Sequence, residues 1–113
     1  MKIYPLILLS AFSLNLQAAA KIELKFRAGE SVKNFRLDSA TTKKDQFDFF
    51  YKKAKRIQLQ KSQNKNLCIR NYIELTLIEE NTVSKRVGCL NSNEKIASGL
   101  KGFAGLLNLQ YGK

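Results

Sequence analysis

The 113-residue sequence contains no histidine, no tryptophan, one proline and two cysteines. Without histidine, the chain lacks the side chain that most often serves as a general base or metal ligand near neutral pH. The cysteines are too far apart for a Cys-x-x-Cys redox pair, and there is neither a glycine-rich phosphate loop nor a metal-ligand spacing. Two Ser-x-x-Lys matches, at 62–65 and 98–101, stand without the partner motifs of penicillin-recognising enzymes. We therefore predict a protein that is not an enzyme and that holds no metal and no cofactor.

The first twenty residues, MKIYPLILLSAFSLNLQAAA, have the three parts of a secretory signal peptide. Lys2 gives a positive start, residues 3–16 are mostly apolar, and residues 18–20 are alanines of the kind that signal peptidase recognises. The apolar stretch is shorter than the ~20 residues needed to span a bilayer. We predict cleavage of residues 1–20. Residues 21–113 then form a single small globular domain without a transmembrane segment, located in the periplasm or secreted.

The two cysteines, Cys68 and Cys89, are predicted to form a structural disulfide, because small exported domains usually pair their cysteines. The sequence between them alternates apolar and polar residues on both sides of a turn centred between Glu80 and Asn81, which predicts a β-hairpin. Such a turn places Cys89 opposite Tyr72 and not opposite Cys68. The disulfide therefore requires either a bulge in the first strand or a position of Cys68 in the segment that leads into it.

Alternation of apolar and polar residues predicts three further strands. Residues 21–28 alternate along their whole length, and after a turn at Gly29-Glu30 residues 33–37 alternate again. Residues 56–61 alternate through Ile57 and Leu59.

A helix is predicted where Phe47, Phe50, Tyr51 and Ala54 fall on one helical stripe. A capping box from Thr42 to Asp45 would begin it. The competing interpretation is a strand through residues 47, 49 and 51, which would leave Phe50 exposed.

The C-terminal region predicts a second, shorter helix capped by Asn93 and carrying Ile96, Leu100 and Phe103. Residues 107–111 alternate again and favour a final strand. Together these elements predict an α+β fold: a small antiparallel sheet of about five strands with one or two helices on one face, and one disulfide.

The net charge of +11 is unevenly distributed, since no acidic residue occurs from Phe49 to Ile73. That stretch contains seven cations, which we call the basic tract: Lys52, Lys53, Lys55, Arg56, Lys61, Lys65 and Arg70. We predict that the tract binds a polyanion or an acidic partner, in a manner that weakens with salt. The alternative is a solvated helix end and loop, because cations suit a helix C-terminus without any ligand.

The first functional hypothesis is an exported basic binding module that docks on an acidic protein or an envelope polyanion, as an inhibitor or immunity-type protein does. Nucleic acid is a disfavoured partner: the aromatic residues at 47–51 could stack bases, but the helical stripe assigns them to the core. The alternative is a structural or assembly component of a cell-envelope complex, which needs an exposed apolar tail at residues 100–109. Peripheral contact of residues 94–110 with a membrane interface is a third hypothesis.

Overall fold

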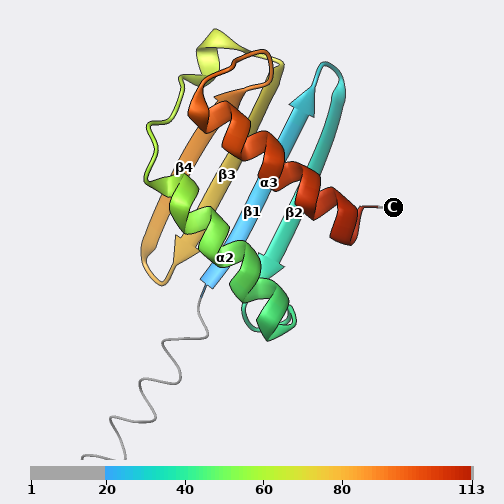
Figure 1. The fold of residues 1–113 in the computed structure, drawn as a ribbon, viewed down its shortest axis with the longest axis vertical. Helices are drawn as coiled ribbons and strands as arrows, with labels where there is room; N and C mark the ends of the chain where they lie inside the picture. Colours follow the sequence, from blue (N-terminus) through green and yellow to red (C-terminus); the bar gives the residue numbers. More distant parts are fainter. Residues whose placement is uncertain (1–19, 113) are drawn as a thin grey trace, which may run out of the picture.

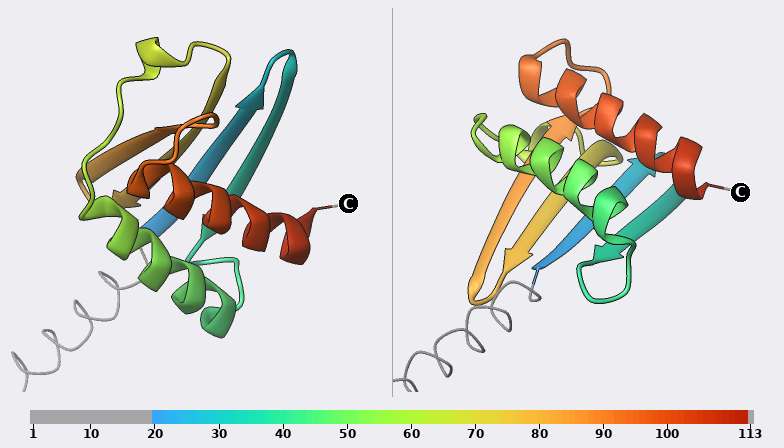
Figure 2. Two further views of the ribbon diagram at one scale, coloured as in Figure 1. Left: turned by 45° about the horizontal axis from the view of Figure 1, so that its top comes forward. Right: turned by 60° about the horizontal axis from the view of Figure 1, so that its bottom comes forward.

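The computed structural model describes residues 20–112, so the predicted signal segment up to residue 19 lies outside the described residues. Four antiparallel strands form one sheet in the order β2-β1-β3-β4, and two helices cover one of its faces (Figure 1, Figure 2). The elements are β1 Ala20–Ala28, β2 Ser31–Asp38, α2 Lys44–Gln58, the 3-10 helix η1 Lys65–Leu67, β3 Asn71–Glu79, β4 Thr82–Cys89 and α3 Lys95–Tyr111. The predicted α+β class is confirmed, with four strands in place of about five.

The sheet has one apolar face because its strands alternate in register. Leu24 of β1 lies between Phe35 of β2 and Leu75 of β3, and all three side chains face the helices. Leu24 and Leu75 are fully buried there, together with Ile22 and Leu77 on the same face. The alternate positions of these strands carry mostly charged or polar side chains, which face away from the helices. The hydrophobic core therefore lies in a single layer between the sheet and the two helices.

Two-residue loops join β1 to β2 and β3 to β4. In each loop the first residue has a positive φ, 65° at Gly29 and 53° at Glu80, as tight hairpins of this length require. The second loop sets the predicted register, with Cys89 opposite Tyr72. Cys68 directly follows η1, in the segment that leads into β3, so the second of the two routes to the disulfide is the one used.

Helix α2 buries the predicted stripe, with Phe47, Phe50 and Ala54 in the core. Two local predictions are wrong. Thr42 does not cap the helix, because its hydroxyl accepts a hydrogen bond from the Asp38 amide, and the N-cap residue makes no side-chain hydrogen bond. Residues 56–61 are not a strand either, since α2 continues to Gln58 and buries Ile57 on its own apolar stripe.

The C-terminal region forms one helix, α3, and not a short helix followed by a strand. Asn93 is not its cap; Glu94 holds that position, and its amide donates to the Ser92 hydroxyl. Six side chains at helical spacing are buried beneath α3: Ile96, Ala97, Leu100, Phe103, Ala104 and Leu107. Because most of the stability of a helix comes from packing of its apolar face, this burial outweighs the glycines and the short alternation that favoured a strand.

The segment between α2 and β3 wraps around the edge strand β4 onto the helix-free face of the sheet. The Gln63 amide donates to the Val87 carbonyl (2.8 Å), and the Ser62 hydroxyl accepts from the Val87 amide (2.7 Å). Beyond these bonds the disulfide joins Cys68 to Cys89, with 5.6 Å between the Cα atoms. Val87, Cys89 and Tyr72 are buried under this segment although they face away from the helices. The disulfide therefore holds a small second core in place.

Replacing both cysteines with serine should lower the free energy of unfolding by about 2–4 kcal/mol, because the closed loop restricts the unfolded chain. Urea denaturation of the double variant and of the unchanged protein measures this difference. Thiol titration of denatured, unreduced protein should detect no free thiol. Two reactive thiols per chain in freshly exported protein would contradict the structural role and favour a redox pair.

Candidate functional site

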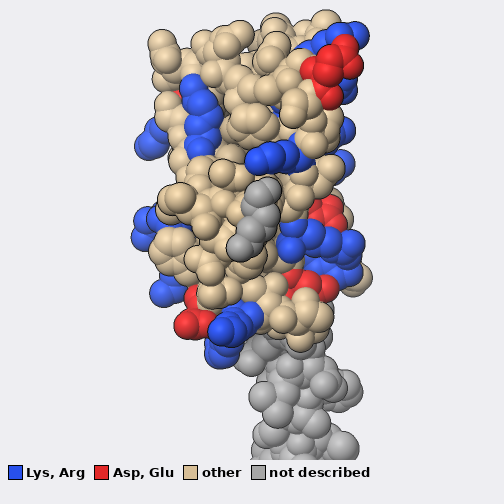
Figure 3. Space-filling view, turned by 90° about the vertical axis from the view of Figure 1, so that its right-hand side faces the viewer, with Lys and Arg blue, Asp and Glu red and all other residues tan. Residues whose placement is uncertain are grey.

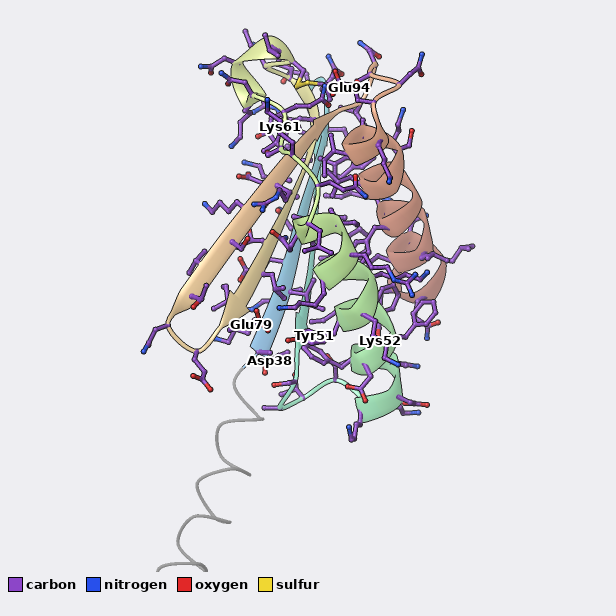
Figure 4. All side chains as sticks on the ribbon, turned by 60° about the vertical axis from the view of Figure 1, so that its left-hand side comes forward. Asp38, Tyr51, Lys52, Lys61, Glu79 and Glu94 are labelled. Carbon is purple, nitrogen blue, oxygen red and sulfur yellow. A yellow bond between two sulfur atoms is a disulfide. The ribbon has the colours of Figure 1, made fainter. Side chains whose placement is uncertain are left out.

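The structure divides the basic tract between the two faces of the sheet. Lys52, Lys53, Lys55 and Arg56 lie in the second half of α2, on the helix-covered side. Lys61 lies on the connecting segment, well away from Lys52 in Figure 4. Lys65 has passed around the β4 edge, and its ammonium pairs with Glu74 on the helix-free face. The seven cations of the tract are therefore close together in the sequence but do not form one surface.

Three cations of the tract have carboxylate partners within the fold. Lys55 pairs with Glu79 at 3.2 Å, and Lys65 pairs with Glu74 at 3.1 Å. Arg70 pairs with the exposed Glu30 at 3.3 Å. The remaining four, Lys52, Lys53, Arg56 and Lys61, make no ion pair with any residue in the range 20–112. Lys65 also lies over the Tyr72 ring, 5.0 Å from its centroid, so it helps to cover the second core. The unpaired cations are the better candidates for contact with a partner.

Three of the unpaired cations share the solvent side of α2 with an exposed aromatic ring. Phe49, Lys52, Lys53 and Arg56 have the spacing i, i+3, i+4 and i+7, which places them on one helical stripe opposite the buried one. Phe49 is 49% exposed, and the Lys53 ammonium lies 4.9 Å from its ring centroid. We call these four residues the outer stripe of α2. The assignment of all the aromatics at 47–51 to the core is therefore wrong for Phe49, which a helical projection places on the solvent side.

A shallow hollow of about 360 Å³ lies between α2 and α3 beside the outer stripe. Its apolar lining includes Phe49, Leu106 and Leu109. Leu109 is 83% exposed, although most of the apolar C-terminal segment is in the core. The outer surface of the helix layer thus combines three cations that make no ion pair among the described residues with a mostly apolar depression, whose lining also includes the carboxylate residue Asp45.

The burial of the apolar tail bears on the assembly hypothesis. Leu100, Phe103 and Leu107 are buried, and Leu106 is packed against the core. Only Leu109 of this set is exposed. The exposed tail on which that hypothesis depended is therefore not present, and the same burial removes the apolar face that residues 94–110 would offer to a membrane. None of the described helices is long and apolar enough to cross a bilayer.

The Lys55 ammonium belongs to a polar cluster at the edge of the core and does not point freely into solvent. The Tyr51 hydroxyl donates a hydrogen bond to the Glu79 carboxylate, and Lys55 contacts the other oxygen of the same group. Figure 4 shows Tyr51 and Glu79 close together at the end of β3. The Tyr51 hydrogen bond, and then Lys55, lower the pKa of Glu79. The same hydrogen bond, with burial and the carboxylate charge, raises the pKa of Tyr51 to about 12.

Within residues 20–112 no three His, Cys, Asp or Glu side chains are grouped so that they could hold a metal ion. Comparison of the chain with protein-family models, with curated proteins and with solved structures found no match.

Replacing Tyr51 with phenylalanine should lower the stability by about 1 kcal/mol at neutral pH, because the Glu79 carboxylate loses its donor. A lowered pKa stabilises the fold above the ordinary value of 4.5 and loses this effect as the pH falls. The difference between Y51F and the unchanged protein should therefore shrink below pH 4.5. It should also shrink as the pH rises from 10.0 toward 12, where the Tyr51 hydroxyl itself ionises.

Urea denaturation as a function of pH measures this profile, and Tyr111→Phe is the matched control. The Tyr111 hydroxyl donates to the neutral amide oxygen of Gln46 at 3.0 Å, so its loss should cost the same at pH 3 as at pH 7. A pH-independent difference for Y51F would show that Glu79 is not the group that Tyr51 stabilises.

Proposed function

We propose that this protein is an exported, basic binding module that docks on an acidic partner through the outer surface of its helix layer. The observation that carries the proposal is the outer stripe of α2, where Phe49 lies beside the unpaired cations Lys52, Lys53 and Arg56. Ion pairs within the fold do not use these charges. They are therefore available to steer and hold an acidic molecule.

An acidic protein fits this surface better than a simple polyanion. A polyanion needs only charge, whereas the surface also offers the half-exposed Phe49 ring and the apolar hollow that contains Leu109. Interfaces between proteins are enriched in aromatic anchors that fill pockets, with charged residues at the rim. The cations of the outer stripe surround such an anchor on one side. An acidic protein with an apolar side chain at the centre of its contact face would use both features.

The predicted signal peptide supports an activity outside the cytoplasm, where disulfides persist in small domains. A binding module of this kind acts by occupying the surface of its partner, as an inhibitor or immunity-type protein does, and needs no catalytic group. Ion pairs hold Lys55, Lys65 and Arg70 to carboxylates of the fold, and Lys61 lies on the connecting segment away from α2, so we propose that the contact is limited to the helix layer.

The test compares two variants of equal net charge. Lys52→Glu with Arg56→Glu reverses two charges of the outer stripe, and Lys85→Glu with Lys95→Glu reverses two exposed charges elsewhere. Each immobilised variant and the unchanged protein are exposed to envelope extract at low salt, and retention of the most abundant stoichiometric partner is quantified. The outer-stripe variant should bind about tenfold more weakly, because two pairs worth up to about 1 kcal/mol each become repulsive. The control variant should bind as the unchanged protein does.

Phe49→Ala separates a protein partner from a polyanion. It should weaken the retained partner while leaving retention on heparin unchanged, because heparin responds to charge alone. Equal losses in both charge-reversed variants would mean that net charge and not a site is recognised. Equal retention in both would remove the outer stripe from the proposal.

A further inference from the structure

The edge strand β2 presents unused backbone hydrogen-bonding groups. Ala28 and Ser31 close a two-residue loop, so the backbone groups of residues 31, 33, 35 and 37 bond to β1, and those of the alternate residues point away from the sheet. The amides and carbonyls of Val32, Asn34 and Arg36 have no hydrogen-bond partner among residues 20–112. The open stretch ends at Asp38, whose amide donates to the Thr42 hydroxyl.

At the opposite edge of the sheet, part of the outward backbone groups are hydrogen-bonded within the chain. On β4 the outward groups of Val87 are bonded to Ser62 and Gln63, and the Cys89 amide donates to the Gln63 side chain at 2.9 Å. The connecting segment therefore covers the half of β4 nearest the disulfide. No segment of the described chain covers β2 in this way, and its residues 31–34 are exposed.

A hollow of about 430 Å³ lies directly beside the open stretch of β2. Phe35 and Leu37 of β2, Gln46 of α2 and Tyr111 of α3 contribute to its lining. Phe35 and Leu37 face the helices, so the hollow is on the helix side of the sheet edge. A fifth strand paired with β2 would continue the pleat, and its alternate side chains would point to that side and enter the hollow.

The charged side chains along the β2 edge indicate which kind of strand could pair with it. Lys33, Arg36 and Lys43 lie along it, and Lys43 is part of the lining of the hollow. Arg36 is paired with Glu23 of β1 at 3.5 Å, and the Lys33 ammonium donates to the neutral Asn108 side chain, so the charges without a carboxylate partner among the described residues are those of Lys33 and Lys43. The one carboxylate within the strand, Asp38, accepts a hydrogen bond from the Ala40 amide. Figure 3 views the molecule from this side and shows basic side chains on both flanks of the face, with a smaller number of acidic side chains among them. A second copy of the chain would bring a second set of these cations to the edge, whereas an acidic strand would neutralise them.

We propose that β2 accepts an extended acidic segment of a partner protein by strand addition, with one side chain of the added strand in the hollow between β2, α2 and α3. Main-chain hydrogen bonds to residues 32, 34 and 36 supply affinity, and the hollow supplies side-chain selectivity. The site uses the N-terminal end of α2 and the sheet edge beyond it. It shares no residue with the outer stripe, and only Gln46 lines both this hollow and the one beside that stripe, so variants of β2 test it separately from the function proposed above.

The probe is the acetylated peptide amide Thr-Val-Glu-Val-Glu-Val-Glu-Thr, titrated into isotope-labelled full domain and followed by NMR. The amides of Val32, Asn34 and Arg36 should shift most. At 90% saturation their hydrogen exchange should slow about tenfold, because exchange then proceeds only from the free fraction. The same peptide with lysine in place of glutamate should not bind. A peptide N-methylated at alternate residues should bind at least about tenfold more weakly, because main-chain donors are lost.

Two proline variants form the matched pair. Asn34→Pro removes an outward amide from β2, and Lys85→Pro removes an outward amide from β4; proline is tolerated at such edge positions. Only Asn34→Pro should abolish binding, and the N-methylated peptide tests the same contact without altering the protein. Absence of binding up to about millimolar peptide, the weak-affinity limit for such a contact, contradicts the proposal, as does equal binding of the N-methylated peptide. A concentration-dependent dimer with protected β2 amides would show that the occupant is a second copy.

Discussion

The fold depends on the close approach of α3 to the backbone of β4 at Gly88. A β-carbon at this position would lie 2.8 Å from the Ala97 Cα atom and 2.9 Å from a methyl group of Leu100. Glycine in a strand commonly marks such a close approach of two backbones. Because Gly88 carries no side chain, the first turn of α3 lies directly on the sheet, and the rest of the helix crosses toward β2 (Figure 1). Leu100 and Leu107 are fully buried as a result.

The position of α3 then determines how α2 presents its charges. Phe50 of α2 packs edge-to-face on Phe103 of α3, with 5.6 Å between the ring centroids. The end of α2 is held by Arg86 of β4, whose guanidinium donates to the Gln58 and Gln60 carbonyls at 2.6 and 2.8 Å. Arg86 thus satisfies the carbonyl of Gln58, which the helix end leaves unpaired, and that of Gln60 just beyond the helix. With one side of α2 buried and its end anchored, the outer stripe faces solvent, where its cations remain unpaired.

The spacing of apolar and polar residues predicted those features that depend on neighbouring residues in the sequence. The alternation of β1, the turn register that set Cys89 opposite Tyr72, and the stripe of α2 were all predicted from spacing alone. The full length of α3 was not, because the burial that outweighs its glycines comes from the sheet and α2. The division of the basic tract could not be predicted either: pairing of Lys65 with Glu74 requires the connecting segment to pass around the sheet edge. The exposure of Phe49 was predictable from helical spacing.

The measurement that tests this account most directly is the stability of Gly88→Ala against Gly102→Ala. Gly102 lies on the solvent side of α3, and an added β-carbon there meets no atom within 4 Å. Alanine at 102 should therefore stabilise the protein by up to about 1 kcal/mol through its higher helix propensity. Alanine at 88 should destabilise it by about 1–3 kcal/mol, because α3 must move off the sheet. Urea denaturation measures both differences. If Gly88→Ala is as stable as the unchanged protein or more stable, the close contact between α3 and β4 at Gly88 does not determine the position of the helix layer.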